Sequence, residues 1–384
     1  MIALGMMSGS SLDGIDCALV DLRARSEGYG LEILDMQTLP FPEPLDKLLH
    51  DVLIDGFADS ERIARLHCAL GVSFADVAIE FLQGRRVDFI ASHGQTLFHD
   101  GAHATTMQIG DPFALRERLG ATVCFDFRSA DCALGGEGAP LVPYVDALLL
   151  GNATEKRAAL NCGGIANVTL LPPGCNADRN LVSAFDTGPG NIAIDGWIAA
   201  ATDRRERYDR DGAHAARGKC DRLLLERMLT NPYFAASPPK STGRERFGES
   251  FLREHHRELA ALSLDDAVAT LTALTVESIA RELERHGFTD ADIFISGGGA
   301  HNRELLRGLR ERLSSARVEC SDVMGIPVDA KEAIAFAILG YETLRERAAN
   351  LPSVTGASRA TALGAIAPYR LRDLLARIDL EGAT

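Results

Sequence analysis

The residues best placed to do chemistry form a short run, Asp186-Thr187-Gly188-Pro189-Gly190-Asn191. The run follows the apolar segment 181–185, which predicts a buried strand, and it precedes a helix predicted from residue 192 onward. A carboxylate at the end of a strand can point into the crevice where open α/β sheets bind ligands. The glycines would let backbone N–H groups approach a phosphate at the positive end of the helix. Taken alone, the run also fits an ordinary corner in which Asp186 caps the helix.

Two further loops have the same character. Ser8-Gly9-Ser10-Ser11-Leu12-Asp13-Gly14 joins two apolar segments, which predicts a β-hairpin whose amides, hydroxyls and carboxylates could hold phosphate and a hydrated metal ion. Gly297-Gly298-Gly299 follows the predicted strand 292–296 and lacks the GxGxxG spacing of a dinucleotide site, which disfavours a nicotinamide cofactor. The second half begins as the first does, with a strand, a polar turn at Gly163-Gly164 and another strand. This similarity indicates a weak internal repeat.

The bulk composition excludes several classes of function. The chain has 384 residues, enough for two domains, and a net charge of −14, which disfavours binding to nucleic acid or to an acidic membrane. No apolar run reaches the ~20 residues of a membrane span. The eight cysteines form no CxxC pair, which is typical of reduced thiols and predicts a cytoplasmic location. His93, His99 and His103 match no common zinc signature.

Two loops outside these motifs affect the predicted organisation. The glycine-rich segment 134–140 is interpreted as the crossing from the first half to the second. The basic, proline-led segment 238–247 is expected to be an exposed and mobile surface loop. With a return crossing near 355–364, these segments predict one domain formed by residues 1–130 and about 358–384, and a second formed by residues 131–357.

Three glycine loops in this order resemble the phosphate and adenosine signatures of the actin-like ATPase superfold, an α/β fold of two domains with ATP in a central cleft. More specifically, several motifs resemble those of the anhydro-N-acetylmuramic acid kinase family, in order through nearly the whole chain. These motifs are Gly5-Met6-Met7-Ser8-Gly9-Ser10-Ser11-Leu12-Asp13-Gly14-Ile15-Asp16, Ser92-His93-Gly94-Gln95-Thr96, Gln108-Ile109-Gly110-Asp111, Asn161-Cys162-Gly163-Gly164-Ile165-Ala166-Asn167, Phe185-Asp186-Thr187-Gly188-Pro189-Gly190-Asn191, Ser296-Gly297-Gly298-Gly299 and Lys331-Glu332-Ala333. At position 6 the chain has Met where the family motif has Thr, so no polar role is assigned there.

The resemblance implies a sugar kinase that uses ATP and Mg²⁺ to open 1,6-anhydro-N-acetylmuramic acid with water and to phosphorylate O6. The products would be N-acetylmuramic acid 6-phosphate and ADP, in the recycling of peptidoglycan fragments, and the enzyme would be a homodimer. Asp186 would take the proton of the attacking water, which combines the base of an inverting glycosidase with in-line phosphoryl transfer.

The resemblance also assigns the remaining site residues. Sugar contacts are expected from His93, Gln95, Thr96, Arg128 and Glu332, with Arg128 as the cation for the lactyl carboxylate. Metal binding, through water, is expected from Asp13 and Asp16. The residues expected to bind the nucleotide are Ser8, Gly9, Ser10, Ser11, Leu12, Asp13, Gly14, Ile15, Asp16, Gly163, Gly164, Asn167, Gly188, Gly190, Asn191, Gly297, Gly298 and Gly299.

Two alternatives stay open from the residues alone. A kinase of another anhydrosugar, such as levoglucosan, would have no need of a cation for a lactyl carboxylate. A non-catalytic actin-like ATP switch would bind ATP without sugar-dependent turnover, and replacing Asp186 would leave its ADP release unchanged.

Overall fold

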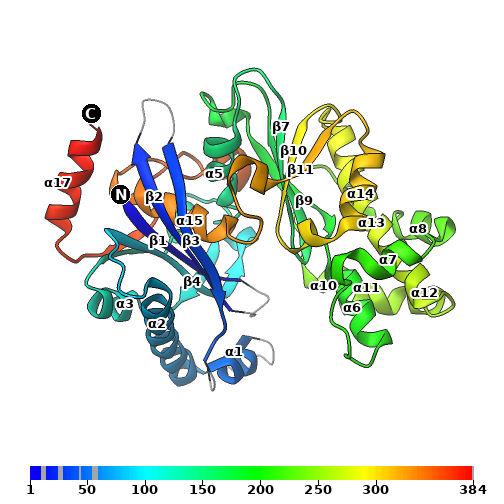
Figure 1. The fold of residues 1–384 in the computed structure, drawn as a ribbon, viewed down its shortest axis with the longest axis horizontal. Helices are drawn as coiled ribbons and strands as arrows, with labels where there is room; N and C mark the ends of the chain where they lie inside the picture. Colours follow the sequence, from blue (N-terminus) through cyan, green and yellow to red (C-terminus); the bar gives the residue numbers. More distant parts are fainter. Residues whose placement is uncertain (10–13, 25–28, 43–44, 54–58, 383–384) are drawn as a thin grey trace. The chain divides into compact units, whose positions relative to one another are not determined.

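The computed structural model describes residues 1–9, 14–24, 29–42, 45–53 and 59–382, and the chain divides into two compact units (Figure 1). Unit 1 comprises Met1–Leu149 and Ala330–Thr384, and unit 2 comprises Leu150–Asp329. Among the described residues, no helix is both long enough and apolar enough to cross a membrane.

Unit 1 is built on a seven-stranded mixed sheet with the order β12-β6-β4-β1-β2-β3, to which β5 adds by pairing with β4. Its strands are β1 (Ile2–Ser8), β2 (Ile15–Ala24), β3 (Tyr29–Leu39), β4 (Phe89–Asp100), β5 (Thr105–Ile109), β6 (Thr122–Phe125) and β12 (Ala365–Ala367). The strands β1, β2 and β3 form an antiparallel meander, whereas β4 runs parallel to β1 and β6 parallel to β4. The β-hairpin predicted at the N-terminus is therefore confirmed.

Helices cover both faces of this sheet because successive strand residues point to opposite sides. Leu4 and Met6 join a core with Phe74 of α2, whereas the intervening Gly5 lies against the backbone of α15 at Ala333. The helices of unit 1 are α1 (Leu45–Leu53), α2 (Ser60–Leu82), α3 (Pro112–Leu119), α4 (Ser129–Cys132), α5 (Val142–Leu150), α15 (Lys331–Leu344), α16 (Pro352–Thr355) and α17 (Leu371–Gly382), with a 3₁₀ turn η1 (Gly101–His103).

Unit 2 is built on a five-stranded sheet with the order β11-β10-β7-β8-β9. Its strands are β7 (Arg157–Cys162), β8 (Ile165–Leu171), β9 (Ser183–Pro189), β10 (Asp292–Ser296) and β11 (Arg317–Cys320). Its helices are α6 (Ile192–Ala201), α7 (Ala213–Arg217), α8 (Arg222–Met228), α9 (Pro232–Ala235), α10 (Arg244–Phe247), α11 (Glu249–Glu254), α12 (His256–Leu259), α13 (Leu264–Arg285) and α14 (Arg303–Arg312), with 3₁₀ turns η2 (Arg179–Leu181), η3 (Arg210–Gly212), η4 (Gly298–His301) and η5 (Ser321–Met324).

The two sheets repeat one topology. In unit 2, β7, β8 and β9 form an antiparallel meander, while β10 runs parallel to β7 and β11 parallel to β10. The order β3-β2-β1-β4-β6 of unit 1 thus corresponds strand for strand to β9-β8-β7-β10-β11 of unit 2. The predicted internal repeat and the predicted two-domain, actin-like α/β fold class are confirmed. The cleft expected with that fold stays a prediction.

The unit boundaries differ from the expected domain boundaries near residues 130 and 357. The segment 134–140 does not connect the two units, because it lies within unit 1 and is held by hydrogen bonds to the buried carboxylate of Asp131. That carboxylate accepts hydrogen bonds from the amide of Gly138 (2.8 Å), the side-chain amide of Asn350 (2.7 Å) and the hydroxyl of Thr355 (2.7 Å). The helix α15 packs on β1, β2 and β4, which also places residues 331–344 in unit 1.

Candidate active site

Asp186 lies within strand β9, not after it. The sequence predicted a strand over 181–185, but β9 runs from Ser183 to Pro189, and the register of its pairing with β8 shifts where Asp186 meets Asn167. This irregularity follows from Gly188, whose backbone has a φ of 153° and whose missing Cβ avoids Phe234 at 2.8 Å. The alternative in which Asp186 caps a helix is wrong, because Asn191 occupies the N-cap of α6.

The carboxylate of Asp186 is unusually basic. Burial raises its pKa to about 6, and the nearby carboxylate of Glu245 adds to the rise. A hydrogen bond from the backbone N–H of Thr242 to Oδ2 (2.8 Å) and the charge of Lys240 act in the opposite direction. A carboxylate with a pKa near 6 is ionised at neutral pH and is still a useful proton acceptor.

The segment 238–247 is only in part the exposed loop that its composition predicted: Pro239, Ser241 and residues 244–246 are exposed, but two other side chains are buried. The side chain of Lys240 is only 4% exposed and forms an ion pair with Glu282 (2.9 Å), which is 2% exposed. Phe247, at the end of the segment, is fully buried against Tyr233 and Phe251. The prediction was wrong for Lys240 because a run of basic residues does not show that a buried acid on a distant helix pairs with one of them.

The turn at Gly163-Gly164 and the start of α6 are joined by backbone hydrogen bonds. The amides of Gly190 and Ile192 donate to the carbonyl of Gly164 (2.9 and 3.0 Å), and the amide of Asn191 donates to the carbonyl of Gly163 (2.8 Å). The N–H groups of Gly190 and Asn191, two residues predicted to bind the nucleotide, are therefore already used within the protein. A Cβ at Gly190 would lie 2.3 Å from the carbonyl oxygen of Gly163, so close packing of the two turns explains this glycine.

The glycines of the third loop have different reasons for lacking a side chain. A Cβ at Gly299 would lie 2.4 Å from Sγ of Cys162, and Gly297 has a φ of 79° with Asn161 close by. At Gly298, which is exposed, a Cβ would approach nothing nearer than 3.7 Å, and Gly163 and Gly164 are similarly open. Among the glycines of the predicted ligand loops of unit 2, Gly163, Gly164 and Gly298 thus have the backbone that a ligand could reach most closely.

In unit 1, Arg128 is held by His93 with part of its guanidinium free. Nε of Arg128 donates to Nε2 of His93 (2.9 Å), and Nη1 donates to the carbonyl of Gly138 (2.9 Å). Nη2 donates to no residue that the structure describes. Burial and the charge of Arg128 lower the pKa of His93 to about 3, so the ring is neutral and its Nδ1–H donates to the carbonyl of Gly94 (3.1 Å). Arg128 therefore keeps a donor edge available for an anion.

Gln95 and Thr96, both predicted to contact the sugar, lie in the middle of β4, beside Ser8 at the end of β1, which was predicted to bind the nucleotide. Ser8 and Gln95 face each other in the β1–β4 pairing, and both are buried. The hydroxyl of Ser8 and Oε1 of Gln95 have no hydrogen-bond partner among the described residues. Burying such groups unpaired costs about 1–3 kcal/mol each, which favours a ligand that satisfies them. Thr96 follows Gln95 in β4 and is only partly buried.

Glu332 lies in the first turn of α15. Burial raises its pKa, and the carboxylate of Asp16 contributes, while Arg128 and Lys331 oppose the rise. Asp16, at the start of β2, accepts a hydrogen bond from the hydroxyl of Thr38 (2.5 Å). Asp16 and Arg128 therefore act on the Glu332 carboxyl in opposite directions within unit 1.

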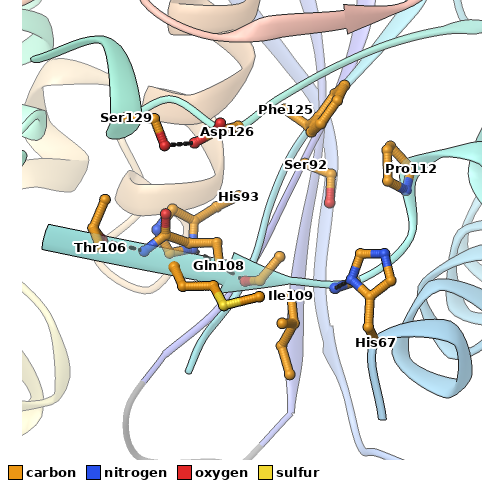
Figure 2. Close-up of a pocket in the computed structure, with 13 residues that line it drawn as sticks. His67, Ser92, His93, Thr106, Gln108, Ile109, Pro112, Phe125, Asp126 and Ser129 are labelled. Carbon is orange, nitrogen blue, oxygen red and sulfur yellow. Dashed lines mark hydrogen bonds between the residues drawn. The ribbon is translucent and has the colours of Figure 1, made fainter. Parts of the chain in front are cut away.

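A pocket in unit 1 is lined in part by His93, the hydrogen-bond partner of Arg128 (Figure 2). His93 and Gln108 line it together with Asp126 and Ser129, whose hydroxyl donates to the Asp126 carboxylate (2.5 Å). Gln108 is partly buried, and its Oε1 is shielded from solvent and has no hydrogen-bond partner among the described residues. Gln108, Asp126 and Ser129 were not predicted as site residues, although Gln108 belongs to one of the family motifs.

The predicted metal site is described only in part. Ser10, Ser11, Leu12 and Asp13 lie outside the described residues, whereas Asp16 lies inside them. Among the described residues, no group of three His, Cys, Asp or Glu side chains could hold a metal ion. Mg²⁺ binds through one or two carboxylates, several waters and substrate phosphates, so a partly exposed Asp16 fits that mode of binding.

The sequence missed Tyr233, Lys240 and Thr242. The hydroxyl of Tyr233 donates to the backbone carbonyl of Asp186 (2.7 Å), and the amide of Asp186 donates to the carbonyl of Lys240 (3.2 Å). No local signal marks these residues, because their contacts join segments about 50 residues apart. Asp195 was missed as well; burial and Asp209 raise its pKa to about 7.

Comparison with known sequences identifies the family. The family model described as anhydro-N-acetylmuramic acid kinase matches residues 1–369. A protein of that name from Caldanaerobacter subterraneus subsp. tengcongensis is 37% identical over 383 residues, covering 95% of this chain and 96% of its own. Another of that name, from Gloeobacter violaceus, is 42% identical over 382 residues, covering 96% and 98%.

Solved structures give more distant likenesses. The activator of the 2-hydroxyisocaproyl-CoA dehydratase from Clostridium difficile with bound ADPNP overlaps 89% of this chain and 95% of its own, with a TM-score of 0.46 and 11% identity. The whole-length sequence matches carry the assignment by themselves, and they confirm the resemblance found in the motifs and the predicted enzyme class, a sugar kinase. The chain belongs to the anhydro-N-acetylmuramic acid kinase family.

Proposed function

We propose that this protein uses ATP and water to open 1,6-anhydro-N-acetylmuramic acid and to phosphorylate its O6, giving N-acetylmuramic acid 6-phosphate and ADP. Family membership supports the kinase activity and the substrate class. The single observation that carries the chemistry is the environment of Asp186, a partly buried carboxylate with a pKa of about 6 that accepts a backbone hydrogen bond at one oxygen. The other oxygen, Oδ1, accepts no hydrogen bond from the described residues.

The proposed reaction gives Asp186 the role of general base. The carboxylate takes a proton from water while the water oxygen bonds to the anomeric carbon, and the C1–O6 bond breaks. The released O6 attacks the γ-phosphorus of ATP, and the bond from that phosphorus to the β,γ-bridging oxygen breaks to give ADP. Thr242 holds Oδ2 through its backbone amide, so Oδ1 is the oxygen that would accept the proton.

The sugar is assigned to polar groups of unit 1. Arg128 would bind the lactyl carboxylate with the free edge of its guanidinium, and His93 would keep that edge in place. Gln95, Thr96 and Glu332 are proposed to bond to hydroxyl or N-acetyl groups. The orphaned Oε1 of Gln95 accepts only, so it requires an O–H or N–H of the ligand.

ATP is the phosphoryl donor in this proposal. The open backbone at Gly163 and Gly164, with Asn167 beside it, is assigned to the phosphates, and Gly298 with its neighbours is assigned to the adenosine. When bound, Mg²⁺ would neutralise charge on the phosphates, and Asp16 would hold it through water. Recycling of cell-wall fragments, a cytoplasmic location and a homodimeric state stay predictions.

The test is ADP release by the purified protein with ATP and Mg²⁺, in the presence and absence of 1,6-anhydro-N-acetylmuramic acid. We expect ADP release that depends on the sugar, and we expect Asp186→Asn to reduce it by about 10²- to 10⁴-fold. ADP release without sugar, or an Asp186→Asn variant with full activity, would contradict the proposal. Parallel assays with levoglucosan test the alternative substrate, which lacks the carboxylate that Arg128 is assigned to bind.

A further inference from the structure

A buried ion pair lies near Asp186. Nζ of Lys240 is 2.9 Å from Oε1 of Glu282 on α13, and the two side chains are 4% and 2% exposed. Nζ also lies 3.4 Å from the carbonyl of Tyr233 and 4.7 Å from the centre of its ring. Arg285 donates to the same Oε1 of Glu282 (2.8 Å). Removing a charge from water is costly, so a lysine in this position needs a reason beyond solubility.

The backbone next to that lysine holds the proposed base at two points. The carbonyl of Lys240 accepts from the amide of Asp186 (3.2 Å), and the amide of Thr242 donates to Oδ2 of Asp186 (2.8 Å). The segment 240–242 is thus placed on one side by its ion pair with α13 and on the other by Asp186. A shift of the lysine would move both hydrogen bonds together.

Lys240 also contributes charge to this region. The charged and titratable groups that interact with Asp186 are Glu245 of α10, Tyr233 of α9 and Lys240. Around them, Arg246 and Glu282 act on Tyr233, and His286 faces Glu282 and Lys240. Of these groups, Glu245 raises the pKa of Asp186, whereas Lys240 lowers it. Lys240 therefore favours the ionised form that a general base requires.

We propose that Lys240 is a positioning residue for Asp186, fixing the backbone of 240–242 through its ion pair with Glu282 and keeping the carboxylate ionised through its charge. This inference rests on the proposed function, in which Asp186 is the base. It assigns a role to a residue of a segment whose composition suggested mere solvated surface. Lys240 itself contacts no reacting atom in this proposal.

The test compares the pH dependence of kcat/KM for the anhydrosugar, at saturating MgATP, in full-length variants. Lys240→Gln removes the charge but keeps a hydrogen-bond donor for Glu282. Because Asp186 then loses a nearby positive charge, the acidic limb of the profile, where kcat/KM falls at low pH, should move to higher pH by on the order of half a unit. Lys240→Arg keeps the charge and should leave the limb within about 0.2 units of the wild-type position. Arg285→Gln is the matched control, because it removes the other positive charge that pairs with the Glu282 carboxylate, and Arg285 makes no contact with Asp186. The acidic limb of this variant should also stay at the wild-type position.

A second variant, Glu282→Gln, should shift the acidic limb in the opposite direction. Glu282→Gln leaves the charge of Lys240 uncompensated and should move the acidic limb to lower pH, opposite to Lys240→Gln. Burial raises the pKa of Glu332 in the wild type and in every variant alike, so any effect of Glu332 on the profile cancels in the comparison. A thermal melt will show whether each variant folds. If one of them does not fold, the direction of the shift in the other variant still tests the inference.

Two results must be distinguished. If Asp186→Asn, measured in parallel, retains activity, the proposed function itself is wrong. If Asp186→Asn is inactive but the limbs of Lys240→Gln and Glu282→Gln coincide with that of the wild type, or if Arg285→Gln shifts as much as Lys240→Gln, Lys240 has no positioning role and only this inference is overturned.

Discussion

At the scale of single residues, the protonation state of Asp186 determines how activity should depend on pH. Its pKa of about 6 means that the carboxylate is protonated at pH 5 and mostly ionised at pH 7. Because only the ionised form can accept a proton, kcat/KM should fall as the pH drops through about 6. A profile from pH 4.5 to 8 tests this prediction, and a rate that stays constant down to pH 4.5 would exclude a base with this pKa.

Arg128 should determine the preference for an acidic sugar. Arg128→Met removes the free Nη2 donor and the charge, so KM for 1,6-anhydro-N-acetylmuramic acid should rise by about 10- to 100-fold. The KM for 1,6-anhydro-N-acetylglucosamine, which has no lactyl carboxylate, should change little. The measurement is steady-state ADP release with both sugars. Equal losses for the two sugars would show that Arg128 supports the fold of the site and does not recognise the carboxylate.

At the scale of elements, the sequence predicted the loops but not how they contact each other. The strand–turn–strand pattern at Gly163-Gly164 and the strand before Gly297 are where the motifs placed them. The backbone hydrogen bonds between Gly163-Gly164 and residues 190–192 could not be predicted, because the two segments share no local sequence pattern. The same holds for Lys240 and Glu282, whose pairing depends on how α13 packs.

The close packing of the two turns can be tested with a matched pair of glycine substitutions. In Gly190→Ala, the new Cβ would lie 2.3 Å from the carbonyl oxygen of Gly163, so the turns must separate. We expect a loss of about 1–3 kcal/mol in the free energy of unfolding and weaker binding of ATP. In Gly164→Ala, the nearest atom is the Cβ of Ile192 at 3.8 Å, so the melting temperature should stay the same.

Thermal melts and nucleotide titrations measure both effects. An equally stable Gly190→Ala variant would contradict the packing that the structure shows between the turns. If Gly164→Ala alone weakens ATP binding without a change in melting temperature, that result supports the assignment of this open backbone to the phosphates.

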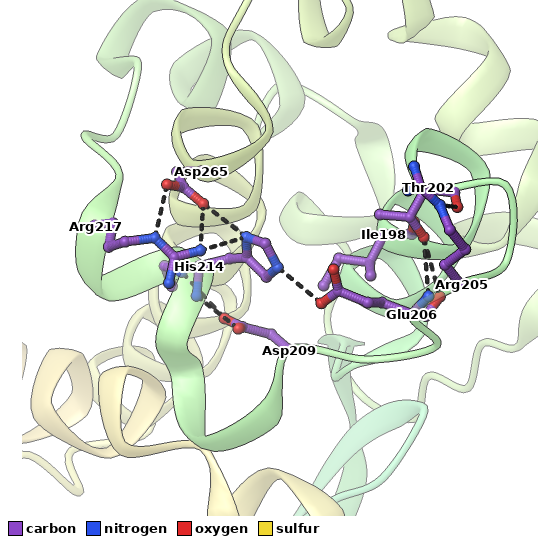
Figure 3. A network of polar contacts seen from close by, with 9 residues as sticks. Ile198, Thr202, Arg205, Glu206, Asp209, His214, Arg217 and Asp265 are labelled. Carbon is purple, nitrogen blue, oxygen red and sulfur yellow. Dashed lines mark hydrogen bonds and ion pairs between the residues drawn. The ribbon is translucent and has the colours of Figure 1, made fainter.

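At the scale of the whole molecule, each unit repeats one sheet topology and carries its own polar network. In unit 2, the ring of His214 lies between the carboxylates of Glu206 (3.0 Å) and Asp265 (2.6 Å), and Arg217 pairs with the same Asp265 (Figure 3). Partial burial favours the neutral ring, but hydrogen bonds to Glu206 and Asp265 outweigh it and raise the pKa of His214. The protonated ring therefore ties α7 to α13.

This network should make stability depend on pH in a defined direction. A pKa raised above the unfolded value of about 6.5 means that His214 stabilises the fold fully below pH ~6.5 and loses this effect as the pH rises through the folded pKa. The difference in melting temperature between the wild type and His214→Gln should therefore be largest at pH 6 and should shrink toward pH 9. A difference that is independent of pH would show that His214 acts by packing alone.

The central claim is that one protein couples attack of water at C1 to phosphorylation at O6. The most direct measurement is mass spectrometry of the sugar product after turnover with ATP and 1,6-anhydro-N-acetylmuramic acid in ¹⁸O-labelled water. We expect a 6-phosphorylated product with one ¹⁸O at C1 at the moment of release and none in the phosphate. Early time points are needed, because the free anomeric centre exchanges with solvent. A label in the phosphate, or a phosphorylated product that retains the 1,6-anhydro bridge, would contradict this claim.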